Sequence, residues 1–215
     1  MSNIFRYRLQ FAWWIMTVMA IAIAGYAFAY FFVDSMGNSD MKAKFATMPL
    51  AAWLHIVGGG IALLIGTFQM NTWLRKKRLS FHRNLGKVYL IAVLLAGLGG
   101  IWLARHAMGG VFTKLGFGML GILWLYTGIN AYVSIRGGDI VSHRRWMIRN
   151  YALTLAAVTL RIYLPLSAVA GISFGSAYAA IAWMCWIPNL IVAEWYFIQR
   201  PHRRSVRRSS VEPAT

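Results

Sequence analysis

Acidic residues are scarce in this sequence, and charged residues of either sign are few. Asp and Glu together number 5 in 215 residues, against 22 Lys and Arg, which gives a formal net charge of +17. Charged residues make up 13% of the chain and hydrophobic residues 59%, with a mean hydropathy of +0.56. So few charges cannot cover the surface of a soluble protein of this size. The composition therefore indicates an integral membrane protein.

The chain also lacks the residue clusters of several common sites. Cys185 is its single cysteine, so cysteines alone cannot form an intrachain disulfide, a zinc ribbon or an iron–sulfur site. The two acids in or near the apolar runs, Asp139 and Glu194, do not form a plausible catalytic pair. No Ser–His–Asp arrangement or metal-ligand spacing occurs in the sequence. A hydrolase is therefore disfavoured.

Six apolar runs reach the length of about 20 residues that a helix needs to cross a bilayer. They are too long for strands and lack alternation, so we predict an all-α protein with a single integral membrane domain over residues 1–215. Residues 199–215 form a basic tail. Ala27-Phe28-Ala29 resembles a signal-peptide cleavage site, but the first run is too long for one, so we expect it to remain as a span. The predicted spans are roughly 9–33, 48–74, 85–104, 110–135, 146–171 and 175–198.

Lysine and arginine are distributed unevenly between the two sides of the predicted bundle. One side holds Lys42, Lys44, Arg105 and Lys114, and the other holds all the rest except Arg161, which lies inside a span. The positive-inside rule places the basic side and both termini in the cytoplasm, and we expect a bacterial cytoplasmic (inner) membrane. The positive charge then attracts anionic lipid headgroups by about 1 kcal/mol per residue, so a nucleic-acid partner is not expected.

When the sequence is shifted by 61 residues, several polar residues coincide with residues of the same or a similar type, as His82 does with His143 (143 − 82 = 61). The second and third helices would thus be repeated as the fourth and fifth, about an axis along the membrane normal. Helices two to five then form a pseudo-symmetric four-helix core, flanked by helices one and six, in which the two histidines face each other at equal depth. The matching pairs are Gln69 and Asn130, Arg75 and Arg136, His82 and His143, and Arg83 and Arg144.

A polar stripe follows the fifth run. Because 18 residues make five helical turns, His143 and Arg161 point the same way in a straight helix, with Asn150 and Thr154 near the same line. An arginine inside a span costs at least about 2.5–3.5 kcal/mol, so we expect Arg161 to face the bundle. Its candidate partners are backbone carbonyls, an acidic group of a ligand, or His55 through water.

The polar residues of the spans fall into two layers at different depths. Glu194 lies near the cytoplasmic end, away from the depth of Arg161, and we expect it to pair with Arg149 or with the N-terminal arginines. The outer layer consists of His55 and Arg161, with His106 as a further candidate. The inner layer consists of Gln69, Arg75, His82, Tyr89, Asn130, His143 and Arg149.

Small residues recur at every fourth position from Gly58 to Gly66. This spacing lets two helices approach closely, although the glycines after His55 would equally leave room for a flat ligand beside it. Pro188, followed by Asn189, predicts a kink in the sixth span. No span is interrupted in the manner of a discontinuous transporter helix.

Three motifs carry a family resemblance. "LHIVGGGIALLIGTFQ", "SFHRNLGKVYLIAVLLAG" and "HRRWMIRNYALTLAAVTLRIYLPL" resemble a family of predicted bacterial membrane proteins catalogued as domain of unknown function 2306 (DUF2306). The resemblance covers most of residues 48–198. The family has no established reaction, so it implies a fold and no activity.

A looser resemblance is to six-helix membrane proteins of the cytochrome b561 type, whose four core helices hold two b-type haems through histidine pairs. It implies that His82 and His143 ligate the iron of one haem, with arginines on its propionates. Helix four has no histidine, so His55 lacks a partner for a second haem. The candidate ligand-binding residues are His55, Gln69, His82, Arg83, Tyr89, His143, Arg144, Arg149, Asn150 and Arg161.

Three classes of function stay open. A redox protein would bind haem b or a quinone between the paired histidines. A small-molecule or lipid transporter would attract an anionic group with Arg161 and relay protons through His55. In a non-catalytic accessory or assembly subunit the polar stripe would hold the protein's own helices together, and the two His-Arg motifs would anchor it at the membrane interface. An absorbance spectrum of the purified protein separates the first class from the others.

Overall fold

The computed structural model describes residues 3–30, 32–33 and 39–199, and the regular elements in these ranges are all helical. Six helices in the described ranges are long and apolar enough to cross a membrane. The all-α, six-span prediction is therefore confirmed. These spans are Gln10–Ala29, Pro49–Gln69, Leu79–Ala104, Gly110–Arg136, Ile140–Val169 and Phe174–Gln199.

Breaks divide some of the spans, and two short helices lie between others. In chain order the elements are α1 (Asn3–Ala29), α2 (Ser39–Ala46), α3 (Pro49–Gln69), α4 (Thr72–Lys77), α5 (Leu79–Ala104), α6 (Gly110–Arg136), α7 (Ile140–Thr154), α8 (Ala156–Val169), α9 (Phe174–Met184), α10 (Ile187–Val192) and the π-helix η1 (Ala193–Gln199). The predicted span 48–74 thus comprises α3 and part of the separate helix α4.

Helices α5 and α7 begin six residues earlier than the apolar runs predict (85 − 79 and 146 − 140). Hydropathy locates the part of a helix that fits the hydrocarbon, whereas a helix itself runs on into its polar flank. Asp139 caps α7, because its side chain accepts a hydrogen bond from the backbone N–H of Ser142 at 2.9 Å. This hydrogen bond lowers the pKa of Asp139 below its ordinary value.

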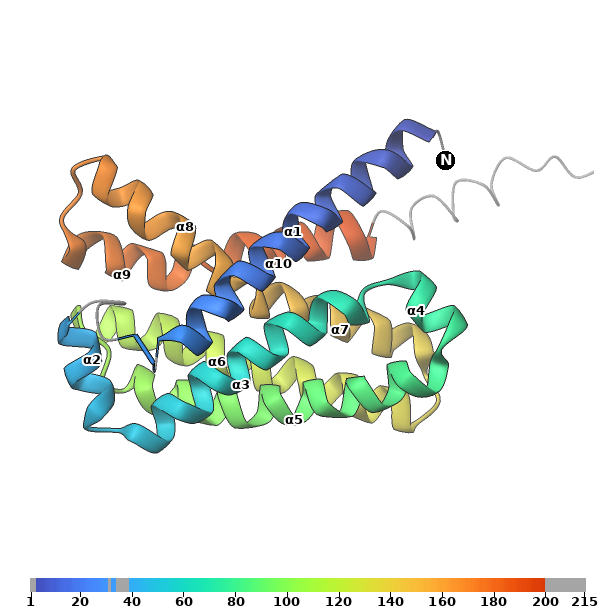
Figure 1. Ribbon diagram of the computed structural model, residues 1–215, viewed down its shortest axis with the longest axis horizontal. Coiled ribbons are helices and arrows are strands. Elements are labelled where there is room, and N and C mark those ends of the chain that lie inside the picture. Colours follow the sequence, from blue (N-terminus) through green and yellow to red (C-terminus); the bar gives the residue numbers. More distant parts are fainter. Residues whose placement is uncertain (1–2, 31, 34–38, 200–215) are drawn as a thin grey trace, which may run out of the picture.

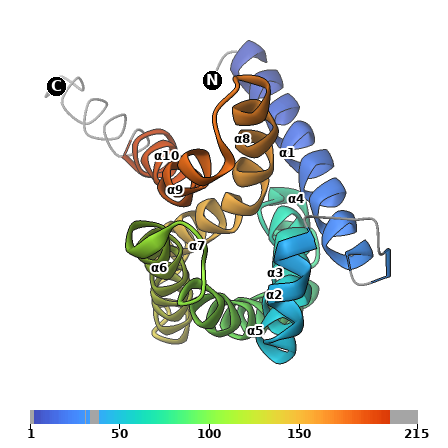
Figure 2. The same ribbon diagram turned by 90° about the vertical axis from the view of Figure 1, so that its left-hand side faces the viewer.

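Helices α3, α5, α6 and α7 form the four-helix core, and α1 packs across the outside of α3 (Figures 1 and 2). Helix α9 packs against α6 and α8. Buried apolar residues from α3, α5, α6, α7 and α9 make up the main hydrophobic cluster. The expected core of helices two to five, flanked by helices one and six, is therefore present.

The structure bears out the internal repeat in its helix boundaries. Helix α3 begins at Pro49 and α6 at Gly110 (110 − 49 = 61), and α5 begins at Leu79 and α7 at Ile140 (140 − 79 = 61). The repeat also relates Tyr89 to Asn150, and these two side chains meet in a direct hydrogen bond. Equivalent positions touch each other only near a twofold axis, so the pseudo-twofold axis passes through this contact.

The fifth span is broken at Leu155, where α7 gives way to α8. Figure 1 shows α8 leaving the direction of α7, away from the core. The prediction that His143 and Arg161 lie on one line of a straight helix is therefore wrong. Uninterrupted helical geometry pairs each carbonyl with the N–H four residues on, and the break disturbs this pattern.

Asn189 holds the break in the fifth span. Its Nδ2 donates to the carbonyl of Ala152 at 3.3 Å and contacts Thr159 Oγ1 at 3.0 Å. A side chain that takes over a helix carbonyl in this way is a recognised cause of kinks. Asn189 itself follows a second break, between α9 and α10, so the predicted kink near Pro188 is confirmed. The fifth and sixth spans are kinked at these breaks, and each still runs as one span, Ile140–Val169 and Phe174–Gln199.

Glycines bring α3 and α5 into close contact. A Cβ added at Gly58 would lie 3.0 Å from the carbonyl oxygen of Ala92, and one added at Gly99 would lie 2.7 Å from that of Ala51. A Cβ at Gly60 would meet the ring of Phe28 of α1 at 3.0 Å. The close-packing interpretation is confirmed at Gly58 and Gly60, where α5 and α1 occupy the space next to the glycines, whereas a Cβ added at Gly59 would meet no described atom within 4 Å.

Candidate functional site

An uncharged hydrogen-bond network fills the centre of the four-helix core. Tyr89 Oη donates to Asn150 Oδ1 at 2.6 Å, and both residues are 0% exposed. Asn150 Nδ2 donates to the carbonyl of Trp124 at 2.7 Å and to Thr127 Oγ1 at 2.9 Å. Trp124 Nε1 donates to Thr154 Oγ1 at 2.9 Å. In the described part of the chain the buried polar centre is thus neutral, and it is not the His/Arg site that the sequence predicts.

Replacing Asn150 by alanine should lower the free energy of unfolding by about 1–3 kcal/mol, because it leaves buried partners such as Tyr89 without their hydrogen bonds. Asn130→Ala is the matched control, since the Asn130 amide donates only to Tyr126 of its own helix, at 2.8 Å. We expect this control to change the free energy of unfolding by about a few tenths of a kcal/mol, because it removes no hydrogen bond between helices. Unfolding of both variants in mixed micelles measures the difference, and equal losses would contradict the network.

His82 and His143 occupy equivalent positions near the starts of α5 and α7. His143 Nδ1 lies 2.8 Å from the carbonyl oxygen of Ala131. A carbonyl only accepts, so Nδ1 carries the proton and the Nε2 lone pair is left for another partner. His82 Nδ1 is buried and has no hydrogen-bond partner among the described residues. By the repeat, the carbonyl that corresponds to Ala131 belongs to Met70 (131 − 61). Because α3 has already ended at Gln69, this carbonyl is not held in a helix beside His82 as the Ala131 carbonyl is beside His143.

Positive charges gather around this histidine pair. His82 lies in electrostatic range of Arg75, His143 and Arg83. Burial, and then the charge of Arg144, lowers the pKa of Arg75 below its ordinary value. Among the described residues the ion pair found is Arg149–Glu194, so none of these cations has a carboxylate partner there. We call Arg75, His82, Arg83, His143 and Arg144 the axial cluster.

The residues between the axial cluster and the buried network are small or adaptable. Gly86 lies one turn beyond His82, and a Cβ added there would have Gln69 Nε2 as its one neighbour within 4 Å, at 3.8 Å. The repeat equivalent of Gly86 is Met147 (86 + 61), a flexible side chain that fits irregular spaces. Gln69 Nε2 donates to the backbone carbonyl of His82 at 3.0 Å and so fixes the end of α3 against α5.

The chain matches the family model described as "Predicted membrane protein (DUF2306)" over residues 52–197. The protein belongs to this family. The match runs from α3 into η1 and includes the four-helix core of this DUF2306 protein except the first three residues of α3. No curated protein and no solved structure matches the chain, so the looser resemblance to cytochrome b561 stays a prediction.

The outer polar residues of the DUF2306 protein are satisfied one by one. His55 Nδ1 donates to the carbonyl of Ala96 at 3.0 Å. Arg161 Nη1 donates to the carbonyl of Ala157 at 3.0 Å, and its guanidinium lies 5.2 Å from the ring centroid of Tyr26. The sequence left backbone carbonyls, an acidic group of a ligand and His55 as candidate partners of Arg161, and the hydrogen bond in the structure is to a backbone carbonyl. His106 is exposed in the α5–α6 connection, so it does not join this layer.

Arg149 and Glu194 form the ion pair that the sequence predicts as one of two alternatives. Arg149 Nε and Nη2 donate to the two carboxylate oxygens of Glu194 at 2.9 and 2.8 Å. The guanidinium also lies 4.6 Å from the ring centroid of Trp146. This paired geometry fixes the start of η1 against α7.

Sequence reasoning missed Trp124, Thr127 and the bond between Tyr151 and Thr67. Tyr151 Oη contacts Thr67 Oγ1, and this buried hydrogen bond joins α7 to α3. Two signals pointed toward these residues. A buried tyrosine or tryptophan needs a partner for its polar atom, and Thr127 lies at the repeat equivalent of Gly66 (66 + 61), which faces the same part of the core.

Proposed function

We propose that this DUF2306 protein is a membrane electron-transfer protein that binds one b-type haem between His82 and His143. The observation that carries the proposal is the placement of two imidazoles at equivalent positions of a pseudo-twofold repeat, in electrostatic range of each other. We further propose that this end of the bundle, which carries α4 and the starts of α5 and α7, faces the cytoplasm of a bacterium.

The axial cluster fits haem in its donor set and in its charge. His143 holds its Nδ1 proton on the Ala131 carbonyl, the arrangement by which metal-ligating histidines are usually oriented. Arg75, Arg83 and Arg144 supply the cations that two propionates require. Bound haem would supply one-electron chemistry. The positive charges of this cluster would stabilise the reduced form of a group held there.

The layering of the core leaves room in the proposal for one such group, at this end. The closed layer of Tyr89 and Asn150 lies seven residues beyond each histidine, which is about 10 Å along a helix. Gly86 and Met147 lie between the two layers, and among the described residues a Cβ added at Gly86 would meet only Gln69 Nε2, at 3.8 Å. A second haem near His55 is not part of the proposal, because His55 is bonded to Ala96 and α6 has no histidine.

Adding hemin to the purified protein tests the proposal. We expect a Soret band that saturates at one haem per chain, and a sharp visible band after reduction. Protein that is colourless as purified and takes up no hemin would overturn the haem proposal. Uptake of a quinone without a Soret band would also overturn it, and would assign the axial cluster to quinone binding instead.

A further inference from the structure

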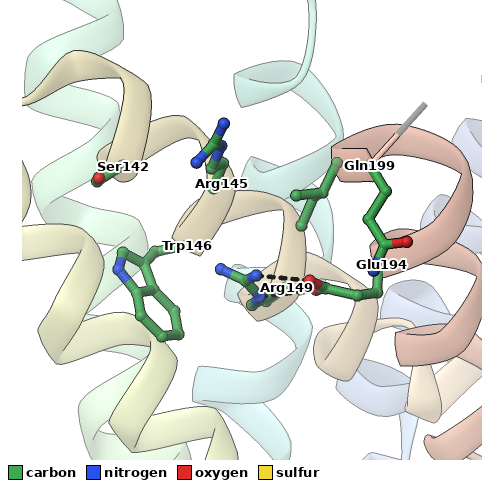
Figure 3. Close-up of a pocket in the computed structure, with 7 residues that line it drawn as sticks. Ser142, Arg145, Trp146, Arg149, Glu194 and Gln199 are labelled. Carbon is green, nitrogen blue, oxygen red and sulfur yellow. Dashed lines mark hydrogen bonds and ion pairs between the residues drawn. The ribbon is translucent and has the colours of Figure 1, made fainter. Parts of the chain in front are cut away.

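A groove opens between the first turns of α7 and the π-helix η1, on a different side of α7 from the axial cluster. Its volume is about 440 Å³, and its lining includes Ser142, Arg145, Trp146, Arg149, Glu194 and Gln199 (Figure 3). The four lining residues of α7 follow the spacing i, i+3, i+4, i+7, so they share one helix face. His143 lies outside this face, about 100° around the helix from Ser142.

The charges in the groove include one cation that has no ion pair among the described residues. Figure 3 shows the bond between Arg149 and Glu194 across the groove, which neutralises both groups. Arg145 is exposed and has no ion pair in the described part of the chain. Asp139 lies in electrostatic range of Arg145 but forms no ion pair with it in the described chain, and its carboxylate is bonded to the backbone and side chain of Ser142 at the cap of α7. The groove is therefore suited to a single negative charge beside Arg145.

An apolar surface adjoins this cation. The indole of Trp146 and the side chain of Ile198 line the groove. Trp146 also packs edge-on against Tyr126 of α6, with ring centroids 5.6 Å apart, and Tyr126 is 54% exposed. Trp146 thus joins the groove to the exposed flank of a membrane-spanning helix. A cation, a hydroxyl and an indole at a span boundary match the headgroup, glycerol and first methylenes of a phospholipid.

We propose that this groove binds one phospholipid with an anionic headgroup from the surrounding membrane. Arg145 binds its phosphate, Ser142 lies beside it at the cap of α7, and Trp146 and Ile198 cover the start of its acyl chains. The Arg149–Glu194 pair lines the groove and joins α7 to η1, so it sets the width of the groove. The π-helix places Glu194 for this pair, in keeping with the frequent use of π-helical turns at functional sites.

Native mass spectrometry of the detergent-solubilised protein tests the groove. Wild type, Arg145→Gln and the matched control Lys76→Gln are titrated with phosphatidylglycerol and with phosphatidylcholine of the same acyl chains. We expect wild type to prefer phosphatidylglycerol, and Arg145→Gln to weaken binding of the first such lipid about fivefold, which is the effect of one charge near the surface. Lys76 is exposed on α4 and outside the groove, so its variant should bind as wild type does.

Three results would overturn the proposal. The first is equal weakening in both variants, which would mean diffuse attraction to a basic surface. The second is equal binding of the two lipids. The third is displacement of phosphatidylglycerol by inorganic phosphate at an equal concentration, which would assign the groove to a soluble anion. Arg145 is exposed, so its variant should fold, and an unchanged melting temperature confirms this. None of the axial-cluster residues lines the groove, so the result is independent of haem binding.

Discussion

Replacing both His82 and His143 by alanine is expected to abolish the Soret band of the reconstituted protein. Each imidazole supplies one axial position in the proposed site, and no other histidine of the described chain lies at this end of the bundle. His106→Ala is the matched control, because His106 is an exposed histidine in the α5–α6 connection at the opposite end. It should retain the full band. Absorbance per mole of protein, after titration with hemin, measures the effect.

The single variants make this prediction sharper. His82→Ala and His143→Ala each leave one ligand, so a weakened and shifted band is expected from either of them. The double variant should melt close to the wild-type temperature when no hemin is present, since neither side chain belongs to the buried network. A double variant that keeps the band, or a His106→Ala protein that loses it, would show that haem binds elsewhere.

Gly66→Ala should lower the free energy of unfolding by at least about 1–3 kcal/mol, because it overpacks a filled core. A Cβ at this position would meet the Tyr151 ring in a severe clash and would lie 3.0 Å from Tyr89 Cε2. The ring of Tyr151 cannot swing away easily, since its hydroxyl is bound to Thr67 and to the carbonyl of Leu63. Unfolding in mixed micelles measures the loss.

Gly59→Ala in the same helix is the control for this substitution. A Cβ at Gly59 has nothing within 4 Å, and alanine favours a helix over glycine by about 0.5–1 kcal/mol. We therefore expect Gly59→Ala to be neutral or slightly stabilising. The packing of α3 against α5 and α7 would be contradicted if the two variants were destabilised alike.

The sequence sufficed for the number of spans and for the repeat. Hydropathy and length decide whether a helix fits a bilayer, and both are properties of a single segment. The offset of 61 residues between His82 and His143 predicted the repeat. The structure shows its equivalent residues Tyr89 and Asn150 bonded to each other across the pseudo-twofold axis. The depth of Glu194 left Arg149 and the N-terminal arginines as its candidate partners, and the structure shows Arg149.

The remaining features depend on contacts between distant segments, and hydropathy does not record these. The break at Leu155 relies on Asn189, which reaches Ala152 from 37 residues further along the chain. Arg161 lies over the ring of Tyr26 in α1, and no pattern in the sequence relates these two residues. A straight helix would place His143 and Arg161 on one face. Because the span bends at Leu155, the two side chains lie in different parts of the structure.

Cross-linking tests most directly the central claim, which is that the repeat brings His82 and His143 together near the pseudo-twofold axis. His82→Cys and His143→Cys are combined in a Cys185→Ala background and treated in membranes with a short bifunctional thiol reagent. The account predicts efficient cross-linking within one chain, and none for His82→Cys combined with His106→Cys, whose sites lie at opposite ends of α5. Failure of the first pair to cross-link, with both thiols reactive toward a monofunctional reagent, would contradict it.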